Sequence, residues 1–295
     1  MSGASGFIGK RLCESLYKDQ HELTALTRST NTLAPIKHLL ASIHQWNGSV
    51  VPDPDPVLKD CDVIINLAGE SIRGYWTSKK RDMLRTSRLS ATRALVTAVN
   101  ESRGYEPMLI SASAIGYYGD RGEEVLSEQS VQGNSFLSEL TTDWEEEAMR
   151  LNNASNKVAL LRLGVVLGSG GGLVAGLKPI YNMGLGGTLG KGNQWWSWIH
   201  IDDVIGVIKF VMSQKLSGPV NLVSPNPERQ KAFSQKFAKI LARPAILGLP
   251  EFVIKVASGG VSEEILSSRN VVPVKLLENE YKFVHPNLED ALAAL

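Results

Sequence analysis

Short apolar stretches alternate with longer amphipathic stretches along the first 220 or so residues. The apolar stretches at 23–26, 42–46, 61–70, 108–111, 158–163 and 219–223 predict strands, and those at 10–16, 78–100, 136–151 and 233–241 predict helices. A strand that is apolar along nearly its whole length is typical of a parallel sheet buried on both faces. The alternation therefore predicts an α/β fold, a Rossmann-like doubly wound parallel sheet.

The same pattern suggests how the chain divides. Residues 1–225 are expected to form the Rossmann-like domain, and residues 243–295 a small α-rich C-terminal lobe. The proline-rich stretch 51–56 and the glycine-rich stretch 168–192 are predicted to be irregular. We expect the second of these to be a mobile binding loop, with residues 168–200 contributing to a substrate lobe. Asp202 is the expected N-cap of the helix that follows.

A glycine-rich turn opens the chain and leads directly into the first helix. Gly3 allows a tight turn, Gly6 lets the backbone approach a pyrophosphate, and Gly9 lets the helix pack on the sheet. The N-terminus of a helix attracts anions through its free N–H groups and its dipole. The loop therefore predicts a dinucleotide site that also involves Ser5, Phe7 and Ile8, although glycines are ordinary turn residues as well.

This turn should follow a buried strand. Only Met1 and Ser2 precede it, so the expected central strand is nearly missing from the sequence. Two explanations remain open: the true start lies upstream, or the protein tolerates a short strand.

The second strand ends in Thr27 and Arg28, with no carboxylate nearby. In dinucleotide folds an Asp or Glu at this place binds the ribose 2′-hydroxyl of NAD, whereas an Arg accommodates a 2′-phosphate. The pair therefore favours NADP(H) over NAD(H). The alternative is an ordinary surface arginine after a strand.

Small polar residues follow two of the central strands. Such residues leave room for a ligand at the C-terminal ends of parallel strands. The predicted cofactor contacts on these strands are Asn66, Leu67, Ala68, Gly69, Glu70 and Ser111. Arg162, inside the strand at 158–163, is expected either to hold a phosphate or carboxylate or to form a structural ion pair.

Composition excludes several classes of protein. The net charge of +1 gives no basic surface for nucleic acid, and no apolar run approaches the length of a membrane span. The two cysteines, Cys13 and Cys61, form no CxxC motif, which argues against a disulfide scaffold and fits a reducing cytoplasm. His200 with Asp202 and Asp203 makes a poor metal cage, so we expect a structural histidine and no metal site.

The motifs together resemble the extended short-chain dehydrogenase/reductases, of the NAD-dependent epimerase/dehydratase type. The resemblance is closest to the branch called epimerase family proteins, some labelled cell division inhibitors, which has its own C-terminal domain. It rests on residues 3–9, 66–70, 76–77, 87–88, 116–120, 144–145, 162–168, 198–203 and 271–277. No residue of the chain supports the cell-division label.

The resemblance implies a catalytic serine, tyrosine and lysine, of which only one is present. Ser113 matches the serine, but Phe136 and Leu140 stand where the family has Tyr and Lys. A literal Tyr-x-x-x-Lys at Tyr75 precedes Ser113 in the chain and is interpreted as a coincidence. The predicted catalytic group is therefore Ser113 with Tyr117 or Tyr118, and the charge of the nearby Arg121 would lower the pKa of the tyrosine. The alternative is that both tyrosine rings simply pack against the nicotinamide or the loop.

Two functions follow from this departure. The first is an NADP(H)-dependent oxidoreductase or epimerase acting on an unknown small polar substrate. The second is a non-catalytic NADP(H)-binding sensor that binds a partner. Both predict a crevice between residues 3–9, 66–70, 111–118 and 168–192, and neither depends on an oligomeric state, which the sequence leaves open.

Overall fold

The computed structural model describes residues 1–51, 54–102, 104, 106–151, 157–258 and 260–295. The N-terminal part is an α/β domain with the following elements: α1 (Phe7–Lys18), β1 (Thr24–Thr27), the 3-10 segment η1 (Thr30–Leu39), β2 (Ser42–Gln45), α2 (Pro54–Leu58), β3 (Val63–Asn66), α3 (Ser78–Glu101), β4 (Met108–Ala114), η2 (Ile115–Tyr118), β5 (Val125–Leu126), α4 (Phe136–Met149), β6 (Val158–Leu163), β7 (Val165–Leu167), β10 (Trp198–His200), α6 (Ile201–Gln214) and β11 (Gly218–Leu222).

The central sheet is parallel. Strands β11, β6, β4 and β3 lie side by side in that order, and β1 pairs with β2. Ser2 joins the two groups, because it forms bridges with Leu26 on β1 and with Asn66 on β3. The order is therefore β2-β1-Ser2-β3-β4-β6-β11, a doubly wound sheet that confirms the predicted fold class.

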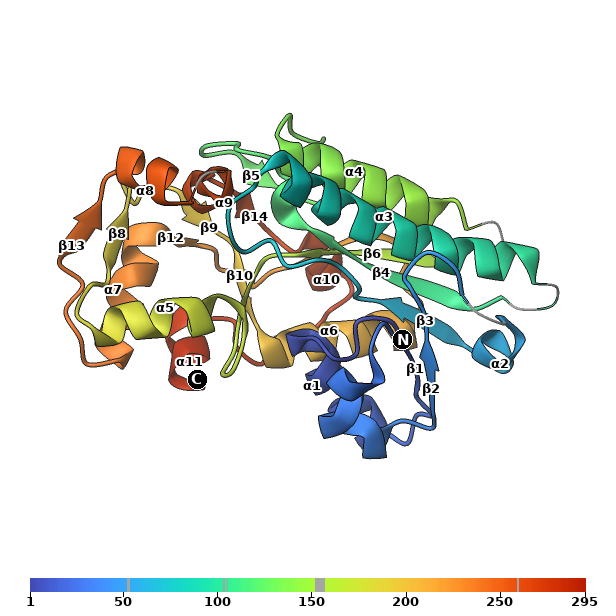
Figure 1. The fold of residues 1–295 in the computed structure, drawn as a ribbon. Coiled ribbons are helices and arrows are strands. Elements are labelled where there is room, and N and C mark those ends of the chain that lie inside the picture. Colours follow the sequence, from blue (N-terminus) through green and yellow to red (C-terminus); the bar gives the residue numbers. More distant parts are fainter. Residues whose placement is uncertain (52–53, 103, 105, 152–156, 259) are drawn as a thin grey trace.

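Helices cover both faces of this sheet (Figure 1). Ile64, Leu109 and Leu160 point to one face, where they pack with apolar residues of α3 and α4. Their chain neighbours Ile65, Ile110 and Leu161 point to the other face, toward α1 and α6. Because successive strand residues alternate between faces, continuous apolar strands of this kind need helices on both sides.

Most of the remaining elements form a second body beside the sheet (Figure 1). It contains α5 (Gly172–Asn182), β8 (Gly187–Leu189), β9 (Trp195–Trp196), β12 (Glu228–Arg229), α7 (Gln230–Ile240), β13 (Leu247–Leu249), α8 (Glu251–Ser258), α9 (Val261–Leu266) and α11 (Leu288–Ala293). Two elements of the C-terminal segment lie on the Rossmann-like domain instead: β14 (Asn270–Val271) pairs with β5, and α10 (Val274–Glu278) packs against β11. The second body has its own core, which contains Trp196, Trp198, Phe233 and Phe237. No helix in the described ranges is long and apolar enough to cross a membrane.

Three local predictions are wrong. The stretch 168–192 is not irregular, because it contains α5 and β8. Residues 54–56 of the proline-rich stretch begin α2, since proline is tolerated in the first turn of a helix; residues 52–53 lie outside the described residues. The N-cap of α6 is His200, whose ring accepts a hydrogen bond from the backbone N–H of Asp202.

Candidate functional site

The glycine loop has the geometry of an anion site. Gly3 has φ of 75°, and a Cβ there would lie 2.6 Å from the carbonyl oxygen of Leu67. A Cβ at Gly9 would lie 2.2 Å from the carbonyl oxygen of Gly3, so glycine is required for α1 to pack this closely. Gly6 is the N-cap of α1 and no side chain caps it, which leaves the first N–H groups of the helix open to a ligand.

A cleft of about 610 Å³ begins at this loop. Its walls come from the glycine loop, the ends of β1 and β3, and one face of α3. The lining residues are Gly3, Ala4, Ser5, Gly6, Leu26, Thr27, Arg28, Ser29, Thr32, Trp46, Asn47, Gly48, Ser49, Leu67, Ala68, Gly69, Glu70, Thr86, Ser87, Ser90 and Ala91. Most of the predicted cofactor residues are therefore brought together. A larger hollow of about 1560 Å³ lies between β1 and β3, and no predicted site residue lines it.

Arg28 is exposed at the mouth of the cleft, next to the buried Thr27. Glu70 lines the same cleft from the other side, but its carboxylate accepts a hydrogen bond from Lys80 at 2.7 Å. That bond lowers the pKa of Glu70 below its ordinary value and neutralises its charge locally. An anion beside Arg28 therefore meets less repulsion than the sequence alone suggests.

Asn66 and Ser111 lie beneath the cleft and not in its wall. Asn66 is fully buried: it accepts a hydrogen bond from the hydroxyl of Ser2 at 2.6 Å and donates one to the hydroxyl of Thr92 at 2.9 Å. Ser111 is equally buried and donates to the carbonyl of Ala112. These contacts favour a role in holding the strand ends in place.

Phe7 and Ile8 begin α1, and Phe7 reaches the glycine-rich segment. A Cβ at Gly171 would lie 2.2 Å from the ring of Phe7, and one at Gly168 would lie 2.7 Å from it. The expected neighbourhood of residues 3–9 and 168–192 is therefore present, and glycine makes the close packing possible.

A buried network joins β4, α4 and β6. The guanidinium of Arg162 donates to both carboxylate oxygens of Glu145, each at 2.8 Å. The hydroxyl of Ser113 donates to the same carboxylate at 2.6 Å. Burial alone would lower the pKa of Arg162, but the pairing with Glu145 raises it above its ordinary value. Of the two interpretations open for Arg162, these contacts favour the structural ion pair.

Tyr118 belongs to this network. Its hydroxyl donates to the side chain of Asn221 at 2.6 Å and accepts from Arg162 at 3.0 Å. The side chain is fully buried, and this burial raises the pKa of Tyr118 to about 12. Such a phenol is a poor proton donor or base near pH 7. The contacts of Ser113 and Tyr118 thus favour a structural role over the catalytic one that the sequence predicts.

The other predicted members of the catalytic group lie nearby. The ring of Tyr117 packs against Arg162, whose guanidinium carbon is 3.5 Å from the ring centroid. Arg121 forms an ion pair with Glu124 and does not hydrogen-bond to either tyrosine. Tyr75 donates its hydroxyl to the carbonyl of Val256 on α8, which fits a coincidental Tyr-x-x-x-Lys match.

His200 has the structural setting that the sequence predicts. Its ring packs against that of His285, with centroids 4.1 Å apart and the planes tilted by 58°, and its Nδ1 lies 3.4 Å from the carboxylate of Asp202. The three side chains could hold a metal ion, but the Nδ1 of His200 already caps α6, and its Nε2 is buried with no hydrogen-bond partner. Metal-bound histidines nearly always donate their second N–H, so this donor set fits an ion poorly.

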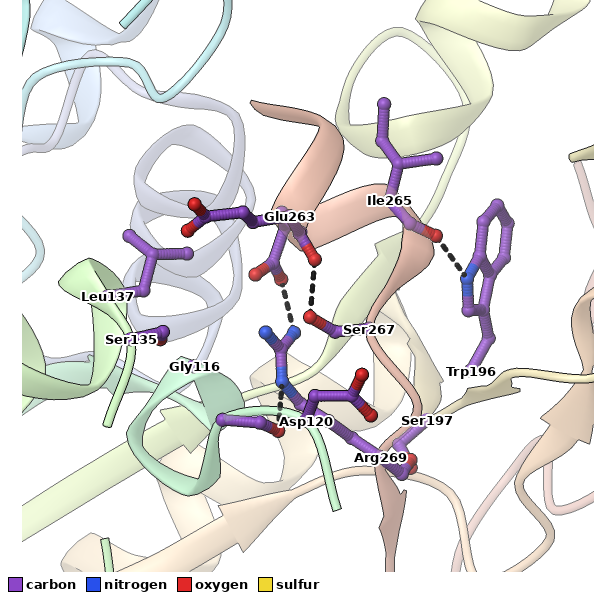
Figure 2. A network of polar contacts seen from close by, with 12 residues as sticks. Gly116, Asp120, Ser135, Leu137, Trp196, Ser197, Glu263, Ile265, Ser267 and Arg269 are labelled. Carbon is purple, nitrogen blue, oxygen red and sulfur yellow. Dashed lines mark hydrogen bonds and ion pairs between the residues drawn. The ribbon is translucent and has the colours of Figure 1, made fainter. Parts of the chain in front are cut away.

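The second body is fastened to the Rossmann-like domain by Arg269. Its guanidinium donates to the carbonyl of Gly119 at 3.0 Å. Figure 2 shows the same guanidinium beneath α9, bonded to a carboxylate of that helix. The carboxylate belongs to Glu264, at 2.7 Å. Arg269 is only 4% exposed, so the contact is shielded from solvent and fixes α9 over the end of η2.

Sequence reasoning missed two groups of residues at the site. Ser87 and Ser90 of α3 line the cleft, and Ser87 accepts a hydrogen bond from the backbone N–H of Glu70. Arg88 lies against Gly69. The signal was available, because residues 87–88 carry part of the family resemblance, but nothing in the sequence shows which face of α3 meets the cleft.

The sheet order and the glycine loop define a dinucleotide-binding protein of the short-chain dehydrogenase/reductase type. A model described as the NAD dependent epimerase/dehydratase family matches residues 1–249, and one described as a domain of unknown function (DUF1731) matches residues 249–295. The chain belongs to the NAD dependent epimerase/dehydratase family, whose members bind a nicotinamide cofactor. The resemblance inferred from the sequence is confirmed.

Relatives extend over the whole chain. It is 34% identical to the chloroplastic epimerase family protein SDR39U1 homolog of Arabidopsis thaliana, over 100% of this chain and 85% of that protein. It is also 34% identical to epimerase family protein YfhF of Bacillus subtilis, over 100% and 96%. Among solved structures, human epimerase family protein SDR39U1 (isoform 2) with NADPH superposes with a TM-score of 0.87 at 29% identity, covering 99% of this chain and 96% of that one.

Proposed function

We propose that the protein binds NADP(H) in preference to NAD(H). The observation that carries this proposal is the position of Arg28 at the mouth of the cleft. Arg28 follows the end of β1, where NAD-binding folds have an Asp or Glu that binds the ribose and this chain has none. The solved human relative contains NADPH, which supports the same preference. In this arrangement the pyrophosphate lies at Gly3–Gly6, and the 2′-phosphate contacts Arg28 and the hydroxyl groups near it.

The proposed reaction is hydride transfer or epimerisation on a small polar substrate. The cofactor supplies the hydride chemistry when it is bound. Of the three residues that we predict to be catalytic, Tyr117 is partly exposed, and its hydroxyl forms no hydrogen bond within the described residues. Ser113 and Tyr118 are buried and hydrogen-bonded. A proton donor for this reaction therefore comes from Tyr117, from water, or from the substrate itself.

A second candidate has its own support. Ser113 and Tyr118 are occupied by Glu145, Arg162 and Asn221, and α4 presents Phe136 and Leu140 where the family has Tyr and Lys. This is what we expect of an NADP(H)-binding sensor that has kept the phosphate loop and lost the proton relay. Its readout is a partner affinity that depends on the cofactor.

Calorimetric titration of the purified chain with NADPH and with NADH tests the binding proposal. Tighter binding of NADPH supports it, and equal affinity or no binding contradicts it. A panel of aldehydes, ketones and nucleotide sugars, monitored by NADPH absorbance, then separates the two candidates. Turnover that Tyr117→Phe abolishes favours the enzyme, whereas no turnover together with an NADPH-dependent change in partner affinity favours the sensor.

Both cysteines are free thiols, Cys13 buried and Cys61 partly buried. Unpaired thiols are typical of a reducing compartment, which supports our proposal of a cytoplasmic location. Labelling with a thiol reagent in denaturant, directly after rapid cell lysis, tests it: unfolding exposes both cysteines, and only reduced ones react.

A further inference from the structure

The four arginines of α3 fall into two kinds: two form ion pairs with α4, and the other two, Arg81 and Arg88, lie over aromatic rings of that helix. Arg85 and Arg93 form ion pairs with Asp143 and Glu147 on α4. Arg88, between them in sequence, has no ion pair with any carboxylate that the structure describes. The guanidinium of Arg88 donates one hydrogen bond within the described chain, to the carbonyl of Leu84 one turn earlier, at 3.1 Å.

The guanidinium of Arg88 is held in place by its surroundings. It lies 5.2 Å above the ring of Trp144 on α4, and a Cβ at Gly69 would lie 3.3 Å from its central carbon. A stacked guanidinium keeps the N–H groups along its edge free. Gly69 is exposed and lines the cofactor cleft, and the absence of a side chain there lets the guanidinium of Arg88 pack directly against this residue of the cleft wall.

Arg88 borders the cleft through Gly69 and does not itself line it, unlike Arg28. On α3 the walls of the adenosine side are Thr86, Ser87, Ser90 and Ala91, and Arg88 is not among them. It faces α4 instead, the helix whose Glu145 meets Ser113 of β4. Since a dinucleotide lies extended across the ends of parallel strands, the β4 side receives the nicotinamide half.

The partial burial of the Arg88 guanidinium favours an anionic ligand beside it. It lowers the pKa of Arg88 to about 10, because the charged form is partly desolvated and only Glu70 opposes this from a distance. The carboxylate of Glu70 is already bonded to Lys80. A cation in this position gains affinity for any oxyanion that enters the cleft.

We propose that Arg88 binds an oxyanion at the nicotinamide end of the cleft, through the free edge of its guanidinium. The shared chemistry is a phosphate or carboxylate group, supplied either by the pyrophosphate of the cofactor or by an anionic substrate. The proposal rests on the proposed cofactor site and adds the chemical class of what binds beside it.

Titrations of four proteins test this assignment: the unaltered chain, Arg88→Met, Arg88→Lys and the control Arg93→Met. Met keeps the stacking on Trp144 without the charge, and Lys keeps the charge without the planar fork. Arg93 is on the same helix, more than half exposed and paired with Glu147, so its variant should bind as the unaltered chain does. Circular dichroism establishes whether each variant is folded. If Arg88→Met does not fold, the binding measured for Arg88→Lys decides the role of Arg88.

Two positive outcomes identify the source of the oxyanion. If Arg88→Met weakens NADPH and NADH alike, by about ten-fold or more, the pyrophosphate is the partner. If dinucleotide affinity is unchanged but inorganic phosphate or malonate binds the NADP⁺-loaded chain about ten-fold more weakly, the partner is a substrate anion. Unchanged binding of both kinds of ligand overturns the proposal.

Failure of the cofactor proposal is recognised separately. If the unaltered chain binds neither dinucleotide, the proposed function fails, and phosphate titration of the free chain decides the role of Arg88. Weaker phosphate binding in Arg88→Met but not in Arg93→Met then supports the oxyanion site. Equal binding in the two variants overturns it.

Discussion

Arg162 and Glu145 form a two-pronged ion pair inside the protein, with both N–O distances at 2.8 Å. Arg162 comes from the middle of β6 and Glu145 from α4, and both side chains are nearly free of solvent contact. The pair also determines where Ser113 and Tyr118 point, because one donates to Glu145 and the other accepts from Arg162. A single buried interaction thus occupies both Ser113, which matches the serine of the family, and Tyr118, which the sequence offers as a substitute for the missing tyrosine.

Removing either member of this pair should destabilise the fold strongly. We expect Arg162→Met to lower the free energy of unfolding by about 3–5 kcal/mol, because Glu145 is left as an unpaired buried charge. Urea unfolding followed by circular dichroism measures the loss. The control is Arg11→Met, which removes an exposed pair with Glu14 and should cost about 1 kcal/mol or less. Similar losses in the two variants would show that the buried network contributes little.

The glycines of the loop should separate folding from binding. A Cβ at Gly9 would lie 2.2 Å from the carbonyl oxygen of Gly3, so Gly9→Ala should lower the free energy of unfolding by about 1–3 kcal/mol. It should also weaken cofactor binding. A Cβ at Gly6 has one neighbour within the protein, the carbonyl oxygen of Gly3 at 3.2 Å, and would stand in the loop that we propose binds the pyrophosphate. Gly6→Ala should therefore unfold nearly as the unaltered chain does but bind NADPH more weakly. Thermal melting and calorimetry on both variants check this, and a Gly6→Ala protein with full affinity would contradict the placement of the pyrophosphate.

Arg28→Ala should weaken NADPH by about 1.5–3 kcal/mol, the loss of a charge-assisted hydrogen bond. NADH, which lacks the 2′-phosphate, should bind almost unchanged. Calorimetric titration with both cofactors measures the difference, and Arg243→Ala, an exposed arginine outside the cleft, is the matched control. Equal weakening of NADPH and NADH would rule out contact with the 2′-phosphate.

His200 should make stability depend on pH. Burial first, and His285 second, lower the pKa of His200 below its ordinary value of 6.5, with Asp202, Asp203 and Arg11 as the other charged groups around it. The unfolded chain then binds a proton more readily than the folded one, so stability should fall as pH drops below about 6.5. Urea midpoints at pH 7.5, 6.5 and 5.5 measure the slope. His200→Asn keeps a capping acceptor but does not titrate, and an unchanged slope in this variant would assign the effect to other groups.

Local patterns in the amino-acid sequence were enough to predict the sheet and the phosphate loop. The sheet follows from alternating apolar stretches, and the phosphate loop follows from glycine spacing, because both depend on backbone sterics and on burial over a few neighbouring residues. Local composition misled at 172–182, where glycine and proline suggested a loop but packing of Val174 and Tyr181 into the second core stabilises α5.

Which polar residues face the cleft depends on contacts between residues far apart in the sequence. Tyr118 is bonded to Asn221, 103 residues later, and Ser113 to Glu145, 32 residues later, so no local pattern shows that these hydroxyls are occupied. Arg88 is one of several arginines on α3, and its lack of a carboxylate partner follows from the packing of α3 on α4. Charge and hydrogen-bonding capacity are written in the sequence, but whether they are satisfied depends on partners that only the folded chain brings together.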